Sequence, residues 1–434
     1  MESTVRTETP QLRQKEKQQS LLLPFILVTS LFFFWGFVHN LDPVLIPHLR
    51  KAFRLNDLES SLVDSSVFIA YFLMALPAGY IMRRYGYKSG IIIGLLLFGI
   101  GSILFVPAAD TLQYVFFLGA LFIIASGLTF LETAANPYIT ILGPAHTATR
   151  RLNFSQSFNG LAAYIAPAYI GPLILSNKNL TQAQMDSMPH DQLQAYLAGE
   201  AASVKMPYLI LGLIILAVAV IFFFTRMPDI KEGHEEHGEA SFAGALASSN
   251  LKWGIIAQFF YVGAQVCVAS FFIRMCTTVA GLDEDTAAKY LGVYGLFFML
   301  GRFAGTFCMQ FIQPKKLLLL YAVINIVLSA VAITSSGITV VYTLIAIAFF
   351  MSIMFPSIFA LGIEGLGHNT KIGSSLIIMS IVGGAILPPV LGLISDKTGN
   401  IQNGYIVPLI CFAVVLLFAV KGHKTMTADR LNLQ

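Results

Sequence analysis

An acidic residue in an apolar setting is the first sign of chemistry in this sequence. Glu132 lies inside a long apolar run, between Phe130 and Pro137, and small residues follow it. A charge at the centre of a membrane helix costs about 2.5–3.5 kcal/mol on insertion scales, so such residues usually have a function. Asn136 follows one helical turn later on the same face. The pattern favours a carboxyl group that carries a proton or holds a sugar; the alternative is a structural hydrogen bond between helices.

A second polar group closes the first apolar segment. Trp35, His39 and Asp42 are spaced at i, i+4 and i+7, along one side of a helix. An aromatic ring stacks on the apolar face of a sugar, while carboxylates and amides bind its hydroxyls, so this stripe suits a sugar. The alternatives are that Asp42 is a turn residue before Pro43 and that His39 is a hydrogen-bond donor between helices.

Asp64 is a third acid in an apolar context, near the start of the second apolar segment and among several serines. Together with Asp42 it forms a possible site for a coupling cation. An acid at this place also complements the positive end of a helix, which is the structural alternative.

Amide side chains recur on two further helices. Gln156 and Asn159 are three residues apart, and Gln258, Tyr261 and Gln265 form a similar set. Residues at these spacings share a helical face. Each buried amide could simply hold two helices together, but their clustering favours a polar cavity that binds the substrate.

Other kinds of chemistry have no motif here. G-x-S-x-G, the P-loop and G-x-G-x-x-G are absent, and the four cysteines lie in apolar runs without C-x-x-C spacing. His234 and His237 have the wrong spacing for H-E-x-x-H and lie in an acidic stretch. Arg274 and Arg302 are expected to be mainly structural. We therefore predict no enzyme activity, no cofactor and no metal site.

The composition of the chain indicates that these residues belong to a membrane protein. Of 434 residues, 56% are hydrophobic and 12% are charged, with a mean hydropathy of +0.73. This excludes a soluble globular enzyme and a disordered chain, because neither can hide so much apolar surface from water. The net charge of +4 is small for this length and gives no reason to expect a nucleic-acid partner.

Twelve apolar runs are long enough to span a bilayer, which takes about 20 residues. They cover approximately 21–49, 60–83, 88–108, 112–141, 152–176, 204–226, 251–279, 286–313, 315–336, 338–366, 371–395 and 402–421. We expect an N-terminal tail over 1–20, six-helix halves over 21–226 and 251–421, a linker over 227–250 and a C-terminal tail over 422–434. The distribution of Lys and Arg among the loops predicts that the linker and both tails are cytoplasmic.

A repeat supports the two halves. Pro167 and Gly171 in the fifth span precede Ser-Asn-Lys178, and Pro388 and Gly392 in the eleventh precede Ser-Asp-Lys397. The two spans occupy the same place in each half and run in the same direction, as a parallel repeat requires.

Four segments, 32–47, 131–138, 261–265 and 355–364, resemble the fucose–galactose–glucose:proton symporter family of the major facilitator superfamily, and above all its bacterial fucose symporters. The resemblance covers about residues 21–420. The stretch from Gly79 to Lys88 is similar to the Gly-and-basic cytoplasmic loop of that superfamily, without its acidic residue.

The resemblance implies an all-α membrane protein with the major facilitator fold, twelve transmembrane helices and one central sugar site that opens alternately to either side. In that family an Asp of helix one and a Glu of helix four carry protons, and the Glu also recognises the sugar. Glu132 matches the Glu. The position of the Asp is Pro43 here, and Asp42 lies one residue earlier, about 100° around a helix.

The expected cavity follows from the same resemblance. Positions that match its polar or aromatic residues are Trp35, Asn40, Gln156, Asn159 and Gln265. Four positions depart from the fucose symporters: Ala269 replaces an aromatic residue, Met354-Phe355 replaces Gln-Tyr, and Asp64 replaces Gln. Changed hydrogen-bonding partners alter which hydroxyl pattern is favoured.

We therefore expect a monomeric, multi-pass transporter of the bacterial cytoplasmic membrane that imports L-fucose or a related hexose, such as galactose or glucose, by cation symport. Protons are the first choice of cation, with Glu132 and Asp42 as the coupling residues. The expected sugar-binding residues are Trp35, His39, Asn40, Glu132, Asn136, Gln156, Asn159, Gln258, Tyr261 and Gln265. The alternatives are sodium coupling through Asp42 and Asp64, and a membrane sugar sensor that does not transport.

Overall fold

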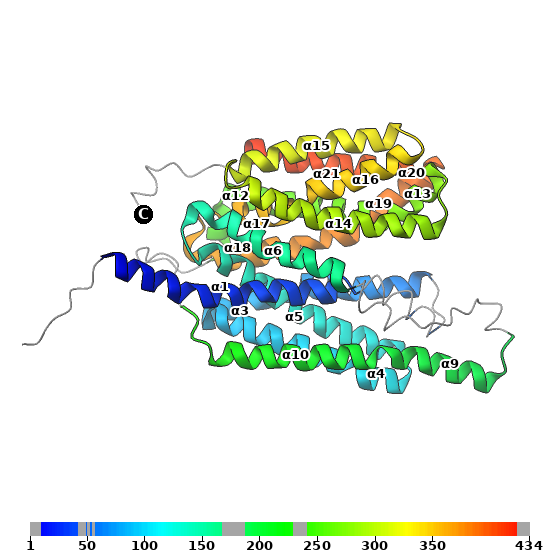
Figure 1. Ribbon diagram of the computed structural model, residues 1–434, viewed down its shortest axis with the longest axis horizontal. Helices are drawn as coiled ribbons and strands as arrows, with labels where there is room; N and C mark the ends of the chain where they lie inside the picture. The colour runs from blue at the N-terminus through cyan, green and yellow to red at the C-terminus, as the bar shows by residue number, and fades with distance from the viewer. Residues whose placement is uncertain are drawn as a thin grey trace, which may run out of the picture.

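The structure is a computed structural model that describes residues 10–41, 49, 53, 57–166, 187–228 and 241–422. Throughout this part the regular secondary structure is helical, in agreement with the all-α prediction. Figure 1 shows long helices that run side by side in two groups. The N-terminal group comprises α1–α10 and the C-terminal group α12–α21, and α6 and α18 lie where the two groups meet.

The N-terminal group contains one feature that differs from the expected spans. Its helices are α1 (Pro10–His39), α3 (Asp57–Ile103), α4 (Phe105–Thr111), α5 (Tyr114–Ile141), α6 (Ala148–Ile165), α9 (His190–Ser203) and α10 (Lys205–Phe224). The second and third expected spans form the single element α3, which changes direction at Gly86 (φ 84°, ψ 169°). Glycine adopts this left-handed backbone without a Cβ clash, so two helical stretches join there in a kink.

In the C-terminal group several expected spans are broken into shorter helices. After the linker helix α11 (Phe242–Ala247) come α12 (Ser249–Ser270), α13 (Phe272–Ala280), α14 (Glu284–Cys308), α15 (Pro314–Thr334), α16 (Ile338–Met351), α17 (Met354–Gly362), α18 (Thr370–Met379), α19 (Gly383–Thr398), α20 (Ile401–Gly404) and α21 (Ile406–Leu417). The break between α16 and α17 has a clear cause. Pro356 has no N–H for the carbonyl of Ser352 and its ring crowds that carbonyl.

Ten helices of the described part are long and apolar enough to cross a membrane. The count is lower than twelve in part because the second and third expected spans are one continuous element and because α6, which contains Arg150, Arg151 and several amides, is not among the ten. The twelve-helix count and the boundaries of the halves therefore remain predictions.

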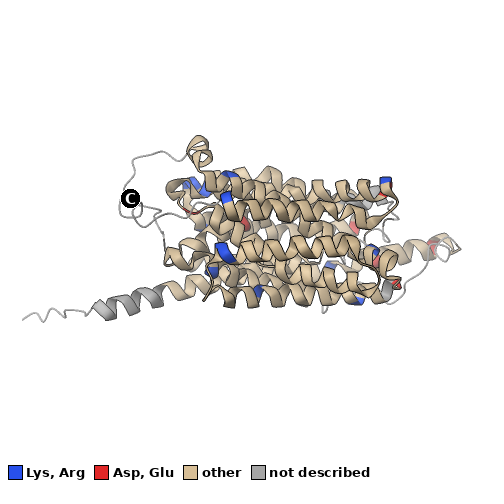
Figure 2. Ribbon diagram, turned by 90° about the horizontal axis from the view of Figure 1, so that it is seen from above, with Lys and Arg blue, Asp and Glu red and all other residues tan. Residues whose placement is uncertain are grey.

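The surface of the bundle suits lipid. Figure 2 shows that most Lys, Arg, Asp and Glu residues lie toward the two ends of the bundle, while its long central part carries few charges. Large apolar side chains such as Phe224, Phe311 and Val115 are exposed on the outside. Hydrocarbon chains accept such side chains, and helices satisfy their own backbone groups there.

Some expected features fall outside the described residues. They are Asp42 and Pro43 in the first sugar-binding stripe, Pro167 to Lys178 in the repeat, linker residues 229–240, and parts of both tails. The side chain of Asp64 is also outside the described part, although its backbone belongs to α3. The predicted roles of these residues remain predictions.

Candidate functional site

Glu132 lies inside the bundle and not against lipid. It belongs to α5, its exposed fraction is 7%, and its neighbours Leu131 and Thr133 are fully buried. The hydroxyl of Tyr71 in α3 donates a hydrogen bond to Oε1 of Glu132, with a length of 2.7 Å. The acid is therefore held between two helices of the N-terminal group, and its functional role stays a prediction.

Asn136 continues this polar face one turn along α5. Its Oδ1 accepts a hydrogen bond of 3.2 Å from Nε2 of Gln156 in α6, and both side chains are buried. Its Nδ2 is buried and has no hydrogen-bond partner within the described residues. A buried donor without a partner costs free energy, commonly about 1–3 kcal/mol. An atom of this kind is ready to bind a ligand oxygen.

Arg302 of α14 joins this face from the C-terminal group. Its Nη1 donates to the backbone carbonyl of Gln156 at 2.7 Å and to Oε1 of Gln156 at 3.3 Å. Its Nε donates to the carbonyl of Ser352 at 3.0 Å, the carbonyl that Pro356 leaves without a helical partner. The guanidinium also lies over the ring of Phe298, 4.7 Å from its centroid. Arg302 thus has structural contacts, as expected, and connects the two groups.

The α12 residues form a separate polar set. The hydroxyl of Tyr261 donates to the carbonyl of Met351 at 3.1 Å, so this residue has a structural bond. Gln258 is fully buried, and neither its Oε1 nor its Nε2 has a partner in the described part of the chain. Gln265 is half-buried. Gln258 is therefore the α12 residue with the most unused hydrogen-bonding capacity.

The residues of α1 only partly form the expected stripe. Trp35 is buried, and its ring lies 4.4 Å from that of Phe32, centroid to centroid. His39 is exposed. It is the last residue of α1, and protein surrounds it although its side chain is accessible. Trp35 and His39 lie one turn apart on the same helix, and they differ in exposure. Their sugar-binding role stays a prediction.

Two amides near α1 have local contacts. Nδ2 of Asn40 donates to the carbonyl of Gly36 at 2.6 Å. A Cβ at Gly36 would lie 2.7 Å from Cγ of Asn159, so the glycine lets α1 and α6 approach closely at this point. Asn159 is half-buried beside this contact. Asn40 is thus engaged with its own helix, and Asn159 packs against α1.

Three contacts between the groups were not predicted. Besides Arg302 and Gln156, the hydroxyl of Ser374 in α18 donates to the carbonyl of Thr133 at 2.9 Å, and Nδ2 of Asn153 in α6 donates to Oγ of Ser357 in α17 at 3.3 Å. One signal was available, because Pro137 removes the helical donor for the Thr133 carbonyl. The donors, more than 200 residues away, have no local signal.

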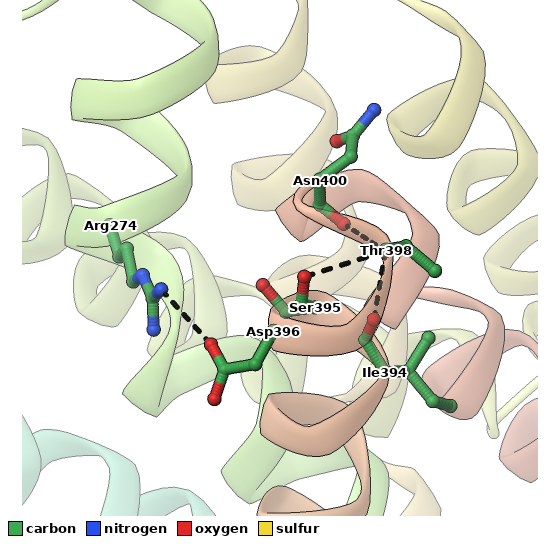
Figure 3. Close-up of polar contacts among 6 residues, drawn as sticks. All are labelled: Arg274, Ile394, Ser395, Asp396, Thr398 and Asn400. Atoms are coloured by element: carbon green, nitrogen blue, oxygen red, sulfur yellow. Dashed lines mark hydrogen bonds and ion pairs between the residues drawn. The ribbon is translucent and has the colours of Figure 1, made fainter.

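The charged pair at one end of the C-terminal group is a different kind of contact. Arg274 of α13 lies 3.6 Å from Oδ1 of Asp396 in α19, and Figure 3 shows the two side chains reaching across to each other beside the hydrogen bonds of Thr398. Both side chains are more than half exposed. A pair of this kind contributes little to stability, which agrees with a minor structural role.

The chain matches the family model of the Major Facilitator Superfamily over residues 25–377. It is 39% identical over 434 residues to the L-fucose-proton symporter of Escherichia coli K12, covering 98% of this chain and 99% of that protein. It is 38% identical over 427 residues to the glucose/galactose transporter of Brucella abortus biovar 1, covering 98% of this chain and 100% of that protein.

Solved structures agree with these sequence relationships. The crystal structure of the transporter FucP in the outward conformation superposes with a TM-score of 0.87 and 40% identity, covering 94% of this chain and 100% of that one. The proton:xylose symporter XylE, at 15% identity and a TM-score of 0.64, shares the fold. The chain therefore belongs to the Major Facilitator Superfamily and, within it, to the family of the fucose and glucose/galactose transporters.

Proposed function

We propose that this protein imports a monosaccharide across the bacterial inner membrane together with protons, by alternating access. The relatives that cover almost the whole chain are named as a fucose–proton symporter and a glucose/galactose transporter, which supports both the cargo and the coupling ion. L-fucose, galactose and glucose are the sugars to test first. The proposal includes twelve transmembrane helices in two halves with both termini on the cytoplasmic side.

The observation that carries the proposal is the polar face of α5. Glu132 is a buried carboxyl group with one hydrogen-bond donor, Tyr71, and Nδ2 of Asn136 is an unused donor one turn away. A sugar hydroxyl both donates and accepts hydrogen bonds, so it can accept from the amide and donate to the carboxylate. A proton and a sugar would then bind at neighbouring atoms, which makes the two binding events interdependent.

The second part of the sugar site is proposed on α12. Gln258 holds an unused donor and an unused acceptor in the buried interior of the C-terminal group. A sugar placed between α5 and α12 would contact both halves, and rocking of one half against the other would expose it alternately to the two sides. Trp35, His39, Asn159 and Gln265 stay as further proposed contacts of the sugar.

The proton carriers are proposed to be Glu132 and Asp42. Desolvation disfavours the charged form of a carboxyl group in general. A carboxyl group inside a bundle can therefore bind a proton from one side of the membrane and release it to the other. Glu132 fits this requirement by its burial and by its hydrogen bond. Asp42 is proposed as the second proton carrier because it lies at the end of the first apolar segment.

Transport by the purified protein in liposomes tests the proposal. We expect counterflow of at least one labelled sugar from a panel of L-fucose, galactose and glucose, and accumulation of that sugar when the outside is made acidic. Glu132→Gln keeps the shape and removes the titratable group, so it should abolish accumulation. The control is Asp110→Asn, the same chemical change at an exposed acid paired with Lys205.

Three results would overturn parts of this assignment. Undiminished accumulation by Glu132→Gln would remove its coupling role. Uptake that needs sodium and survives collapse of the proton gradient would replace the proton, and a larger effect of Asp64→Asn than of Asp42→Asn would then place the ion at Asp64. Binding of a sugar without any counterflow would make the protein a sensor.

A further inference from the structure

We propose that Arg302 is a positioning residue that couples the charge of Glu132 to the contact between the two halves. The proposal rests on the proposed function, because it assigns the means by which proton binding is converted into movement. Arg302 contacts both groups of helices, and it interacts electrostatically with Glu132. The argument combines its burial, its partners and the way in which α6 and α14 approach each other.

The first step concerns what the guanidinium contacts. Arg302 is 4% exposed, and each hydrogen bond that it donates within the described residues ends on a neutral oxygen of Gln156 or Ser352. The described part of the chain contains no ion pair between Arg302 and an acid within 4.0 Å. A buried charge without a direct counter-ion is expensive, so an opposite charge nearby is strongly felt.

The second step concerns which titratable groups face it. The side chains that interact electrostatically with Arg302 are Glu132 of α5 and the phenol of Tyr261 in α12. The phenol is hydrogen-bonded to a carbonyl and is neutral in its ordinary form. Among the described residues, Glu132 is therefore the group whose protonation changes the charge around Arg302.

The third step concerns the packing that brings Arg302 to the N-terminal group. Gly160 lies one turn beyond Gln156 on α6, and a Cβ there would lie 3.5 Å from Cδ of Arg302 and 3.4 Å from Cα of Met299. These are ordinary van der Waals distances, so α14 packs directly against α6 along this face. The backbone carbonyl of Gln156 accepts a hydrogen bond from Nη1 of Arg302. The side chain of Gln156 donates a hydrogen bond to Asn136, which lies one turn from Glu132.

These contacts give the coupling a direction. An ionised Glu132 attracts the guanidinium toward the Asn136–Gln156 side and so strengthens the contact of α14 with α6. When Glu132 binds a proton, that attraction is lost and only hydrogen bonds to neutral groups hold α14 there. Proton binding therefore makes it easier for the halves to separate at this contact, which is the step that symport requires.

Transport by Arg302 variants tests the proposal. Arg302→Gln removes the charge but keeps a donor, so we expect sugar counterflow to persist while proton-driven accumulation falls by about tenfold or more, the effect of losing a hydrogen bond to a charged group. Arg302→Lys keeps the charge and should restore accumulation. The control is Arg274→Gln, the same change in an exposed ion pair, which should leave accumulation at the wild-type level.

The link to Glu132 has its own readout. The dependence of counterflow on pH should be flatter in Arg302→Gln than in the wild type. Adding Arg302→Gln to Glu132→Gln should not change that dependence further, because one pathway is removed twice. Wild-type accumulation by Arg302→Gln would overturn the proposal, as would a further change in the pH dependence of counterflow in the double variant.

Two further results each have a defined interpretation. If Arg302→Gln is not recovered as a folded protein, Arg302→Lys decides: a folded lysine variant with intact counterflow and no accumulation would refute the role of the charge. If the wild type accumulates no sugar at all, the proposed function fails and this inference fails with it, whereas equal accumulation by the wild type and Arg302→Gln refutes the inference alone.

Discussion

The hydroxyl of Ser374 in α18 donates a 2.9 Å hydrogen bond to the backbone carbonyl of Thr133 in α5, the residue that follows Glu132. Both residues are fully buried, and they belong to different groups of helices. The carbonyl is available because Pro137 supplies no N–H one turn later. The proline that loosens α5 beside its acid thus also supplies the acceptor that joins the two groups.

This relationship predicts the behaviour of Ser374→Ala. The Thr133 carbonyl would be left buried without a donor, which costs about 1–3 kcal/mol. We expect faster hydrogen–deuterium exchange in α18 and in the end of α5, because the two groups separate more often. The control is Ser375→Ala, whose hydroxyl bonds to the Lys371 carbonyl of its own helix and which should exchange as the wild type does.

A second variant checks the cause. Pro137→Ala returns an N–H to the Thr133 carbonyl, so Ser374→Ala should cost less in that background than in the wild type. An equal cost in both backgrounds would contradict the account of the freed carbonyl.

Tyr71→Phe is predicted to weaken coupling without preventing folding. The change removes the 2.7 Å hydrogen bond to Glu132 and keeps the ring, which is buried in α3. A hydrogen bond to a charged group contributes about 1.5–3 kcal/mol, so the ionised form of Glu132 loses a substantial stabilisation. We expect proton-driven accumulation in liposomes to fall by about tenfold or more.

The matched control for this change is Tyr80→Phe, an exposed tyrosine of the same helix. It should accumulate sugar as the wild type does. Equal accumulation by Tyr71→Phe and the wild type would show that Glu132 works without this bond.

The sequence predicted those parts of the fold that depend on local composition. Apolar runs identified the helices, and the position of Glu132 within one of them identified the central acid. The reason is that a bilayer imposes length and apolarity on each helix separately. Gly86 shows the limit, because the sharp change of direction within α3 required a left-handed backbone that composition does not reveal.

The site was less predictable because its contacts join distant parts of the chain. The i, i+4 spacing placed Trp35 and His39 on one face, but it could not show that Trp35 is buried against Phe32 while His39 is accessible at the helix end. Tyr71 lies in an apolar run and becomes recognisable only when α3 packs against α5. Arg302 was expected to be mainly structural, and its link to Gln156 needs the docking of α14 on α6.

Arg151→Lys is predicted to destabilise the end of α5. The guanidinium of Arg151 donates to the carbonyls of Ile139, Thr140 and Pro144, at 3.2, 2.6 and 2.8 Å, and so binds the free carbonyls at the helix end. Lysine has a single charged nitrogen and cannot reproduce this fork. Because the site is only partly buried, we expect a loss of about 1–2 kcal/mol, seen as a lower thermal midpoint in detergent.

The neighbouring arginine provides the comparison. Arg150 is exposed, so Arg150→Lys should leave the midpoint unchanged. If both variants melt together with the wild type, the contacts of Arg151 do not hold the end of α5.

Asp283 gives a prediction of pH dependence outside the membrane. Its carboxylate caps α14, the helix of Arg302, by accepting a 2.9 Å hydrogen bond from the N–H of Thr286. That backbone bond, together with one to the Thr286 hydroxyl, lowers the pKa of Asp283 below its ordinary value of 3.8. A group whose pKa is lower in the folded state stabilises the fold above its unfolded pKa and loses that contribution as the pH falls through the folded value.

The test compares thermal midpoints of Asp283→Asn and the wild type between about pH 6 and about pH 3. Asparagine is also a good N-cap residue but does not titrate. We therefore expect the two proteins to be similar at the upper pH and the wild type to lose stability relative to the variant below the ordinary pKa of 3.8. Asp283→Ala should be the less stable protein at the upper pH, since it has no cap. A constant difference between wild type and Asp283→Asn across this range would mean that the cap does not depend on the charge of Asp283.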